Sequence, residues 1–187
     1  MRAVYAFMRG VTWLNERVGR TVAWLILAIF LLLLAEVLLR YFFRSPTVWT
    51  NELGQLLFGA YAVLSGGYLL ARGGHVNVDI LYSAFPRRTK AVIDILTSIL
   101  FFAFLSVLLT QGAIFALESI EKLETSHSVW NPPIWIFKAV IPVSAALLLL
   151  QGIVKLIRDI LIVTGHDVPD DAPAAHDGKD DASKVAL

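Results

Sequence analysis

Four long runs of apolar residues, separated by short polar segments, dominate the pattern of this chain. A bilayer core about 30 Å thick requires roughly 20 apolar residues of helix to cross it. The runs therefore predict membrane-spanning helices over about residues 21–43, 50–71, 91–117 and 134–158. Helices are favoured because the runs are continuous, whereas the strands of a membrane barrel alternate apolar and polar side chains. The predicted fold class is an all-α membrane protein with a four-helix transmembrane domain over 21–163.

Shorter amphipathic patterns flank these spans. Over residues 1–20, apolar side chains recur at helical spacing and arginines fall on other faces, which predicts an amphipathic interfacial helix. A frayed cytoplasmic leader is the alternative for this segment. A second amphipathic surface helix is predicted over about 77–85, because the same spacing returns there and Pro86 stops it. Residues 164–187 are acidic and poor in large apolar groups, so we expect a disordered tail.

The composition supports a chain that lies in lipid and narrows its partners. Apolar residues make up 57% of the chain and charged residues 17%, against about 25% charged in soluble domains. The absence of cysteine excludes disulfides, Cys-ligated zinc and iron–sulfur clusters. The net charge of +1, without a basic patch interleaved with aromatic residues, argues against nucleic acid as a partner.

Motifs of catalytic or cofactor chemistry are absent from the sequence. It contains no G-x-x-x-x-G-K-[ST] phosphate loop, no H-E-x-x-H pair and no G-x-S-x-G nucleophile elbow. The 4 histidines all fall outside the predicted spans, which argues against a membrane haem. We therefore expect no enzymatic activity, no catalytic residue, no cofactor and no metal site.

The distribution of basic residues predicts the orientation. Twelve of the 16 lysines and arginines fall in the amino-terminal segment, the connection between the second and third spans, and the carboxy-terminal region. The remaining four lie in the other two loops or beside them. Because lysine and arginine accumulate on the cytoplasmic side of a membrane protein, both termini are predicted to face the cytoplasm.

Inside the spans, two features are candidates for contacts. Glu36 is the one charge well inside a span, and Arg40 follows it by one helical turn. This pair is either a contact to a partner or substrate path, or a local ion pair at a helix end. In the second span, Gln55, Gly59, Ala62 and Gly66 form a stripe of mostly small residues that another helix could approach closely. Packing within the chain's own bundle is the first explanation of this stripe, and docking of another membrane protein is the second.

The fourth span shows a further polar face. Ser144, Gln151, Lys155 and Arg158 share one side of the predicted helix, so this side is expected to avoid bare lipid. The segment 127–133 before this span contains two adjacent prolines and is predicted not to be helical.

Three stretches together resemble a known family. They are RYFFRSPTVWTNEL at 40–53, RGGHVNVD at 72–79, and PIW at 133–135 followed by IP at 141–142. In order and in placement among four spans they resemble the small membrane subunit of TRAP (tripartite ATP-independent periplasmic) transporters, over about residues 13–163. The family often has two adjacent acids after the tryptophan, where this chain has Asn51 and Glu52.

The resemblance implies a function and partners. In such systems a periplasmic substrate-binding protein captures a small organic acid, and a large membrane subunit carries it inward by an elevator motion driven by a sodium gradient. The small subunit resembles a fixed scaffold for the large one in the bacterial inner membrane. Membrane lipid is the remaining expected partner. Substrate and ion sites lie in the large subunit, so none are transferred to this chain.

Candidate partner-interface residues follow from the resemblance and from the patterns above. They are Glu36, Arg40, Arg44, Trp49, Glu52, Gly59, Gly66, His75 and Asp79. Anchoring at the membrane interface is the alternative role of the residues around Trp49, and fixing a turn is the alternative for His75 and Asp79.

Two rival functions belong to other classes. A self-sufficient small homo-oligomeric transporter or channel would need no large subunit. A membrane enzyme acting on lipid would need a reactive cluster, and the nearest set, His75, Asp79 and Asp94, has a spacing that matches no catalytic motif.

Overall fold

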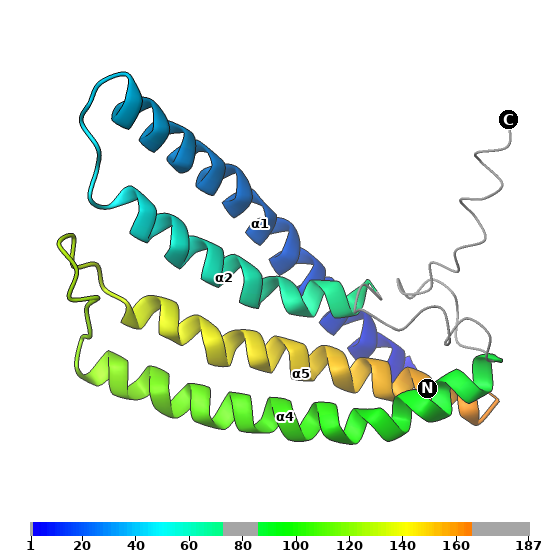
Figure 1. The fold of residues 1–187 in the computed structure, drawn as a ribbon. Helices are drawn as coiled ribbons and strands as arrows, with labels where there is room; N and C mark the ends of the chain where they lie inside the picture. The colour runs from blue at the N-terminus through cyan, green and yellow to red at the C-terminus, as the bar shows by residue number, and fades with distance from the viewer. Residues whose placement is uncertain (1, 73–85, 166–187) are drawn as a thin grey trace, which may run out of the picture.

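The described part of the chain is a set of four long helices. The computed structural model describes residues 2–72 and 86–165. Within these ranges it contains α1 (Arg2–Tyr41), α2 (Thr50–Ala71), α4 (Arg87–Glu121) and α5 (Trp135–Val163), shown in Figure 1. All four are long and apolar enough to cross a membrane. The all-α fold class with four membrane spans is thereby confirmed.

Each predicted span falls on one of the four helices, with differences of a few residues at several ends. The predicted span 50–71 coincides with α2, while α4 contains the span 91–117 and extends it at both ends. The span 21–43 was predicted too long, since α1 ends at Tyr41. Arg44 adopts a positive φ of 51°, and Pro46 disfavours helical geometry in the residue before it. These two positions turn the chain toward α2.

The segment 2–20 is helical and continues into the first span without a break. Its apolar face is shared between two environments. Met8 and Val11 are buried against Val154 of α5, whereas Phe7 and Trp13 on other sides of the helix are exposed. A helix over these residues was predicted, but its contact with α5 was not. Its position at the membrane interface stays a prediction.

The four helices lie in an open row. α1 packs on α2, α2 on α5, and α5 on α4 (Figure 1). The amino-terminal part of α1 also crosses to α5, which explains why Met8 and Val11 meet Val154. In the most apolar 18-residue stretch of α5, 33% is buried inside the protein, against 6% in the corresponding stretch of α4. The difference arises because α5 has neighbours on two sides. The remaining apolar surface is the surface that lipid or another membrane protein would cover.

Close approach between helices depends on two glycines. A Cβ atom added at Gly19 in α1 would collide with the Tyr68 ring of α2, and one at Gly67 would collide with the Asn15 side chain. Small residues let helix backbones come near each other in membranes, where dispersion contacts and hydrogen bonds replace the hydrophobic effect. The crossing of α1 over α2 therefore requires glycine at both positions.

Several predicted features lie outside the described residues. These are the surface helix over about 77–85, the candidates His75 and Asp79, and nearly all of the predicted tail over 164–187.

Candidate functional site

The candidate residues with side-chain contacts gather where the loops 42–49 and 122–134 lie, which we call the loop end of the bundle (Figure 1). The opposite end, with the amino terminus of α1 and the carboxy terminus of α5, is called the terminal end. At the loop end, Glu36 is 4% exposed although it is charged. A buried charge is tolerated only when other groups compensate it, so its partners decide its role.

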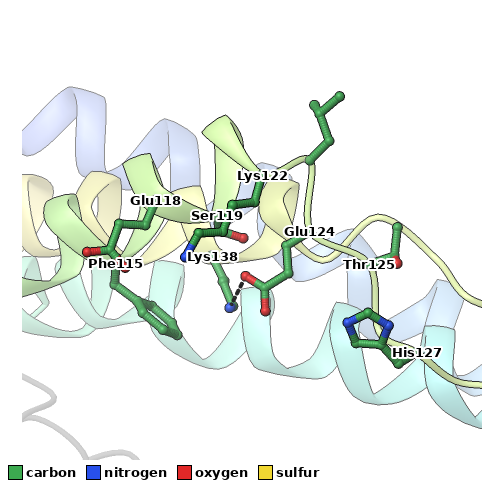
Figure 2. Close-up of a pocket in the computed structure, with 9 residues that line it drawn as sticks. Phe115, Glu118, Ser119, Lys122, Glu124, Thr125, His127 and Lys138 are labelled. Carbon is green, nitrogen blue, oxygen red and sulfur yellow. Dashed lines mark hydrogen bonds and ion pairs between the residues drawn. The ribbon is translucent and has the colours of Figure 1, made fainter.

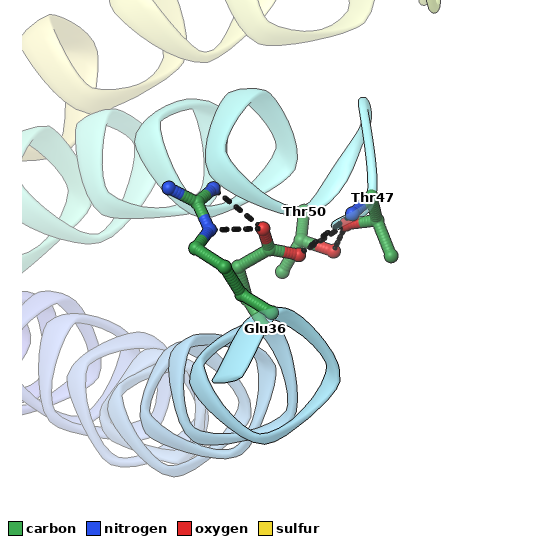
Figure 3. Close-up of polar contacts among 4 residues, drawn as sticks. Glu36, Thr47 and Thr50 are labelled. Carbon is green, nitrogen blue, oxygen red and sulfur yellow. Dashed lines mark hydrogen bonds and ion pairs between the residues drawn. The ribbon is translucent and has the colours of Figure 1, made fainter. Parts of the chain in front are cut away.

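Three residues surround the Glu36 carboxylate, as Figure 3 shows. The Arg40 guanidinium donates to Oε1, with Nη2 at 2.6 Å and Nε at 3.2 Å. The Thr47 hydroxyl donates to Oε2 at 2.5 Å, and the Thr47 backbone N–H donates to the same oxygen at 3.2 Å. The Thr47 and Thr50 hydroxyls share a further, short hydrogen bond. The predicted Glu36–Arg40 pair is confirmed. Glu36 also holds the loop before α2 to α1, through its hydrogen bonds with Thr47.

A second set of contacts joins the two loops to each other. Ser128 donates from its hydroxyl to Glu52 Oε2 at 2.6 Å. The rings of Trp49 and Trp130 lie with their centroids 6.3 Å apart at 48°. Both contacts link the start of α2 to the loop between α4 and α5. These contacts thus hold the α1–α2 pair of helices and the α4–α5 pair together at the loop end.

The loop 122–134 has an internal framework of its own. Thr125 and Pro133 form an isolated antiparallel bridge, and the Asn131 side-chain oxygen accepts from the His127 backbone N–H at 3.1 Å. His127 and Asn131 have positive φ angles of 55° and 52°. The prediction that 127–133 is not helical is confirmed.

An ion pair anchors this loop to α5. Lys138 Nζ lies 2.5 Å from Glu124 Oε2 and 4.1 Å from the centre of the Phe115 ring (Figure 2). The Lys138 ammonium is the main cause that holds the pKa of the Glu124 carboxyl below its usual value of 4.5, and the nearby Ser119 hydroxyl adds to it. The Glu124 carboxyl is therefore ionised at neutral pH.

A polar network also lies at the terminal end. The Asn15 side chain is 1% exposed and donates to the Leu147 carbonyl at 3.4 Å and to Gln151 Oε1 at 3.3 Å. Of the polar face predicted for the fourth span, Ser144 and Gln151 are buried inside the bundle, whereas Lys155 and Arg158 are partly exposed. Sequence reasoning did not single out Asn15. The available signal was a lone amide within the apolar stripe of the segment 1–20.

Charges at the terminal end are paired between helices. Arg72 Nε lies 3.3 Å from Glu16 Oε1, and Lys155 Nζ lies 3.0 Å from Asp94 Oδ2. These pairs connect α2 to α1 and α5 to α4. The structure therefore uses these polar groups for contacts within the chain.

The small-residue stripe on α2 divides between two environments. Gly66 packs against α5, because a Cβ atom there would lie 2.8 Å from Leu148 Cδ1. Gln55, Gly59 and Ala62 are exposed, and a Cβ atom at Gly59 would meet nothing within 4 Å. Packing within the bundle, our first explanation, is wrong for these three residues. They face outward because α2 turns Gly54, Ala60 and Gly67 toward its neighbours instead.

The candidates therefore fall into groups. The structure brings Glu36 together with Arg40, and Glu52 and Trp49 with the loop 122–134. Arg44 is exposed at the turn after α1. Within the described residues, no group of three or more His, Asp or Glu side chains could hold a metal ion. The contacts of these residues hold the helices to one another, while Gln55, Gly59 and Ala62 of α2 remain on the outside.

Comparison with known proteins decides the family. Residues 29–161, more than half of the chain, match the family described as tripartite ATP-independent periplasmic transporters, DctQ component. The chain belongs to the DctQ component family of TRAP transporters. The matched residues of this DctQ chain include Glu36 with Arg40, Thr47 and Thr50, the helix α2, and the loop between α4 and α5.

A curated relative agrees with this assignment. The DctQ chain is similar to the "Sialic acid TRAP transporter permease protein SiaT" of Haemophilus influenzae (strain 86-028NP), with 28% identity over 152 residues. The alignment covers 78% of the chain but 23% of the relative, so the chain spans less than a quarter of that permease. The chain is thus a membrane component of the TRAP class.

Proposed function

We propose that this chain is the small, non-catalytic scaffold subunit of a TRAP transporter in the bacterial inner membrane. A large elevator-type membrane subunit carries a small organic acid inward, driven by an ion gradient that the family resemblance implies to be a sodium gradient. A periplasmic substrate-binding protein delivers the acid. Both termini of the chain face the cytoplasm, so the loop end faces the periplasm, as the distribution of lysine and arginine favours.

The observation that supports this proposal best is the exposed small-residue stretch of α2. Gln55, Gly59 and Ala62 lie on a face to which no described residue adds a side chain near Gly59. Small residues in membrane helices are typical of close helix–helix contact. Packing of a partner helix against this face would account for the small residues there, which packing within the chain does not.

Two further observations support a division of labour. The ionisable groups at Glu36, Glu124 and Lys155 are engaged in ion pairs within the chain, which leaves them unsuited to relay an ion. The relative named as a sialic acid permease is more than four times as long as the part that this chain matches. Sialic acid is an organic acid, which agrees with the proposed substrate class.

Reconstitution in liposomes tests the proposal. The chain alone, the large subunit alone, and both together with the periplasmic binding protein are compared for uptake of a labelled organic acid under a sodium gradient. We expect uptake only with all three proteins, and none after the gradient is collapsed. Sodium-dependent uptake by this chain alone would overturn the scaffold function in favour of a self-sufficient transporter.

A further inference from the structure

A cavity of about 500 Å³ lies at the loop end between α4, the following loop and α5 (Figure 2). Its lining includes Phe115, Glu118, Ser119 and Lys122 of α4 and its C-terminal boundary, together with the Glu124–Lys138 pair. Because α4 ends at Glu121 and α5 begins at Trp135, the cavity lies where two membrane-crossing helices terminate. Lipid headgroups occupy this level of a bilayer.

Ser119 provides the first sign of a ligand. Its side chain lines the cavity and is 1% exposed, and its hydroxyl lies near the Glu124 carboxylate, which already accepts from Lys138, without reaching hydrogen-bond geometry with any described residue. Buried polar groups are nearly always hydrogen-bonded, since an unmet donor or acceptor costs free energy. An acceptor from outside the chain would satisfy this hydroxyl.

The charges of the cavity favour a ligand with both signs. Lys138 is held by Glu124 and by the Phe115 ring. Glu118 and Lys122 are exposed and stand one helical turn apart, a spacing at which side chains are neighbours. They offer the cavity one carboxylate and one ammonium. A purely anionic ligand would be attracted by Lys122 but repelled by Glu118.

The surface of α4 next to the cavity is apolar. Phe104, Val107 and Phe115 follow helical spacing along the same face as Glu118 and Lys122, and they are 67%, 60% and 49% exposed. This face runs from the cavity toward the middle of the helix. An amphiphile with a charged head and an apolar tail fits a polar cavity that continues into an apolar face.

We propose that the cavity binds the headgroup of a zwitterionic phospholipid, with its acyl chain along the Phe104–Val107–Phe115 face of α4. The phosphate accepts from the Lys122 ammonium and the Ser119 hydroxyl, and the headgroup ammonium pairs with Glu118. This site goes beyond the proposed scaffold function and does not depend on it, because binding is measured on the chain itself.

Photo-crosslinking in nanodiscs tests the site. The full chain is placed in a phosphatidylglycerol bilayer with trace probes that carry the same diazirine acyl chain on a phosphatidylethanolamine, phosphatidylcholine or phosphatidylglycerol head. Mass spectrometry then locates the label. We expect the two zwitterionic probes to label α4 between residues 104 and 122 about three- to tenfold more than the anionic one.

Variants show whether the named groups select the headgroup. Glu118→Gln should remove the preference for zwitterionic probes, and Lys122→Gln should lower labelling by all three, about three- to tenfold. Glu121→Gln, which changes an exposed carboxylate outside the cavity lining, is the matched control and should label like the wild type. Thermal unfolding of each variant confirms that the chain is folded.

Three results would overturn the proposal. One is equal labelling of α4 by the three probes, and another is unchanged headgroup preference in folded Glu118→Gln. The third is displacement of the lipid probe by water-soluble phosphoethanolamine at concentrations near those of the probe, which would identify a free zwitterion as the ligand.

Discussion

At the scale of single residues, the polar side chains inside the bundle join one element to another by hydrogen bonds. Asn15 connects α1 to α5, and Glu36 connects α1 to the loop before α2. Each is almost fully buried and each has several partners. Removing one partner from such a group leaves others unsatisfied, which costs more than the hydrogen bond contributes.

Replacing Asn15 tests this view at the terminal end. Asn15→Leu leaves the Gln151 amide oxygen without its Asn15 donor and removes the second donor to the Leu147 carbonyl, which keeps its hydrogen bond within α5, so we expect a loss of about 1–2 kcal/mol in the free energy of unfolding. The double variant with Gln151→Leu should lose less than the sum of the two single variants, because it removes both partners. Thermal unfolding in detergent measures this, with exposed Asn51→Leu as the control. Strict additivity would contradict the network.

The Glu124–Lys138 pair predicts an acid dependence. Since the pKa of Glu124 is lowered in the folded chain, the pair stabilises the fold fully above the ordinary pKa of 4.5 and loses this effect as pH falls through the folded pKa. We expect the Tm of the wild type to fall below about pH 4.5, and the Tm of Glu124→Gln to be lower at neutral pH but less dependent on acid.

Controls separate this pair from general acid effects. Glu121→Gln removes an exposed carboxylate at the end of α4, three residues before Glu124, and should keep the acid dependence of the wild type. An identical acid profile in Glu124→Gln and in the wild type would show that the pair does not contribute.

At the scale of elements, helix content and bounds could be predicted because each follows from a local pattern. The apolar run at 50–71 alone was enough to give α2. The partners of Glu36 could not be predicted in full: Arg40 follows the one-turn rule, but Thr47 lies 11 residues away across a turn. The exposure of Gly59 could not be predicted either, since it depends on which faces of α2 pack against α1 and α5.

The two kinds of glycine on α2 should respond differently to substitution. Gly67→Leu places a side chain where Asn15 lies, so we expect a lower Tm of the chain itself. Gly59→Leu meets open space, so the Tm should be unchanged or slightly higher, while copurification of the large subunit falls.

Gly10→Leu is the matched control, because a side chain there also meets nothing within 4 Å but lies on α1. It should leave both the Tm and copurification unchanged. Full recovery of the large subunit with Gly59→Leu would show that this face of α2 is not the contact.

At the scale of the whole molecule, the row of helices leaves most apolar surface uncovered. Among the described helices, α4 has one principal neighbour, α5, and Leu100 in α4 is 75% exposed. A compact bundle would hide such residues, whereas an open row presents two broad faces and two edges. A shape of this kind suits a chain that occupies area in a membrane and supports a larger partner, as proposed above.

The length of α1 has a consequence for the surrounding bilayer. Its 40 residues correspond to about 60 Å, while a membrane with its headgroups is about 40–45 Å thick. An upright α1 would therefore project into water, and a fully immersed one must be strongly tilted. Its amino-terminal part packs on α5, and its far half is held to α2 and to the loop before it through Glu36 and Thr47. A change in membrane thickness would thus tilt α1 together with the helices that hold it.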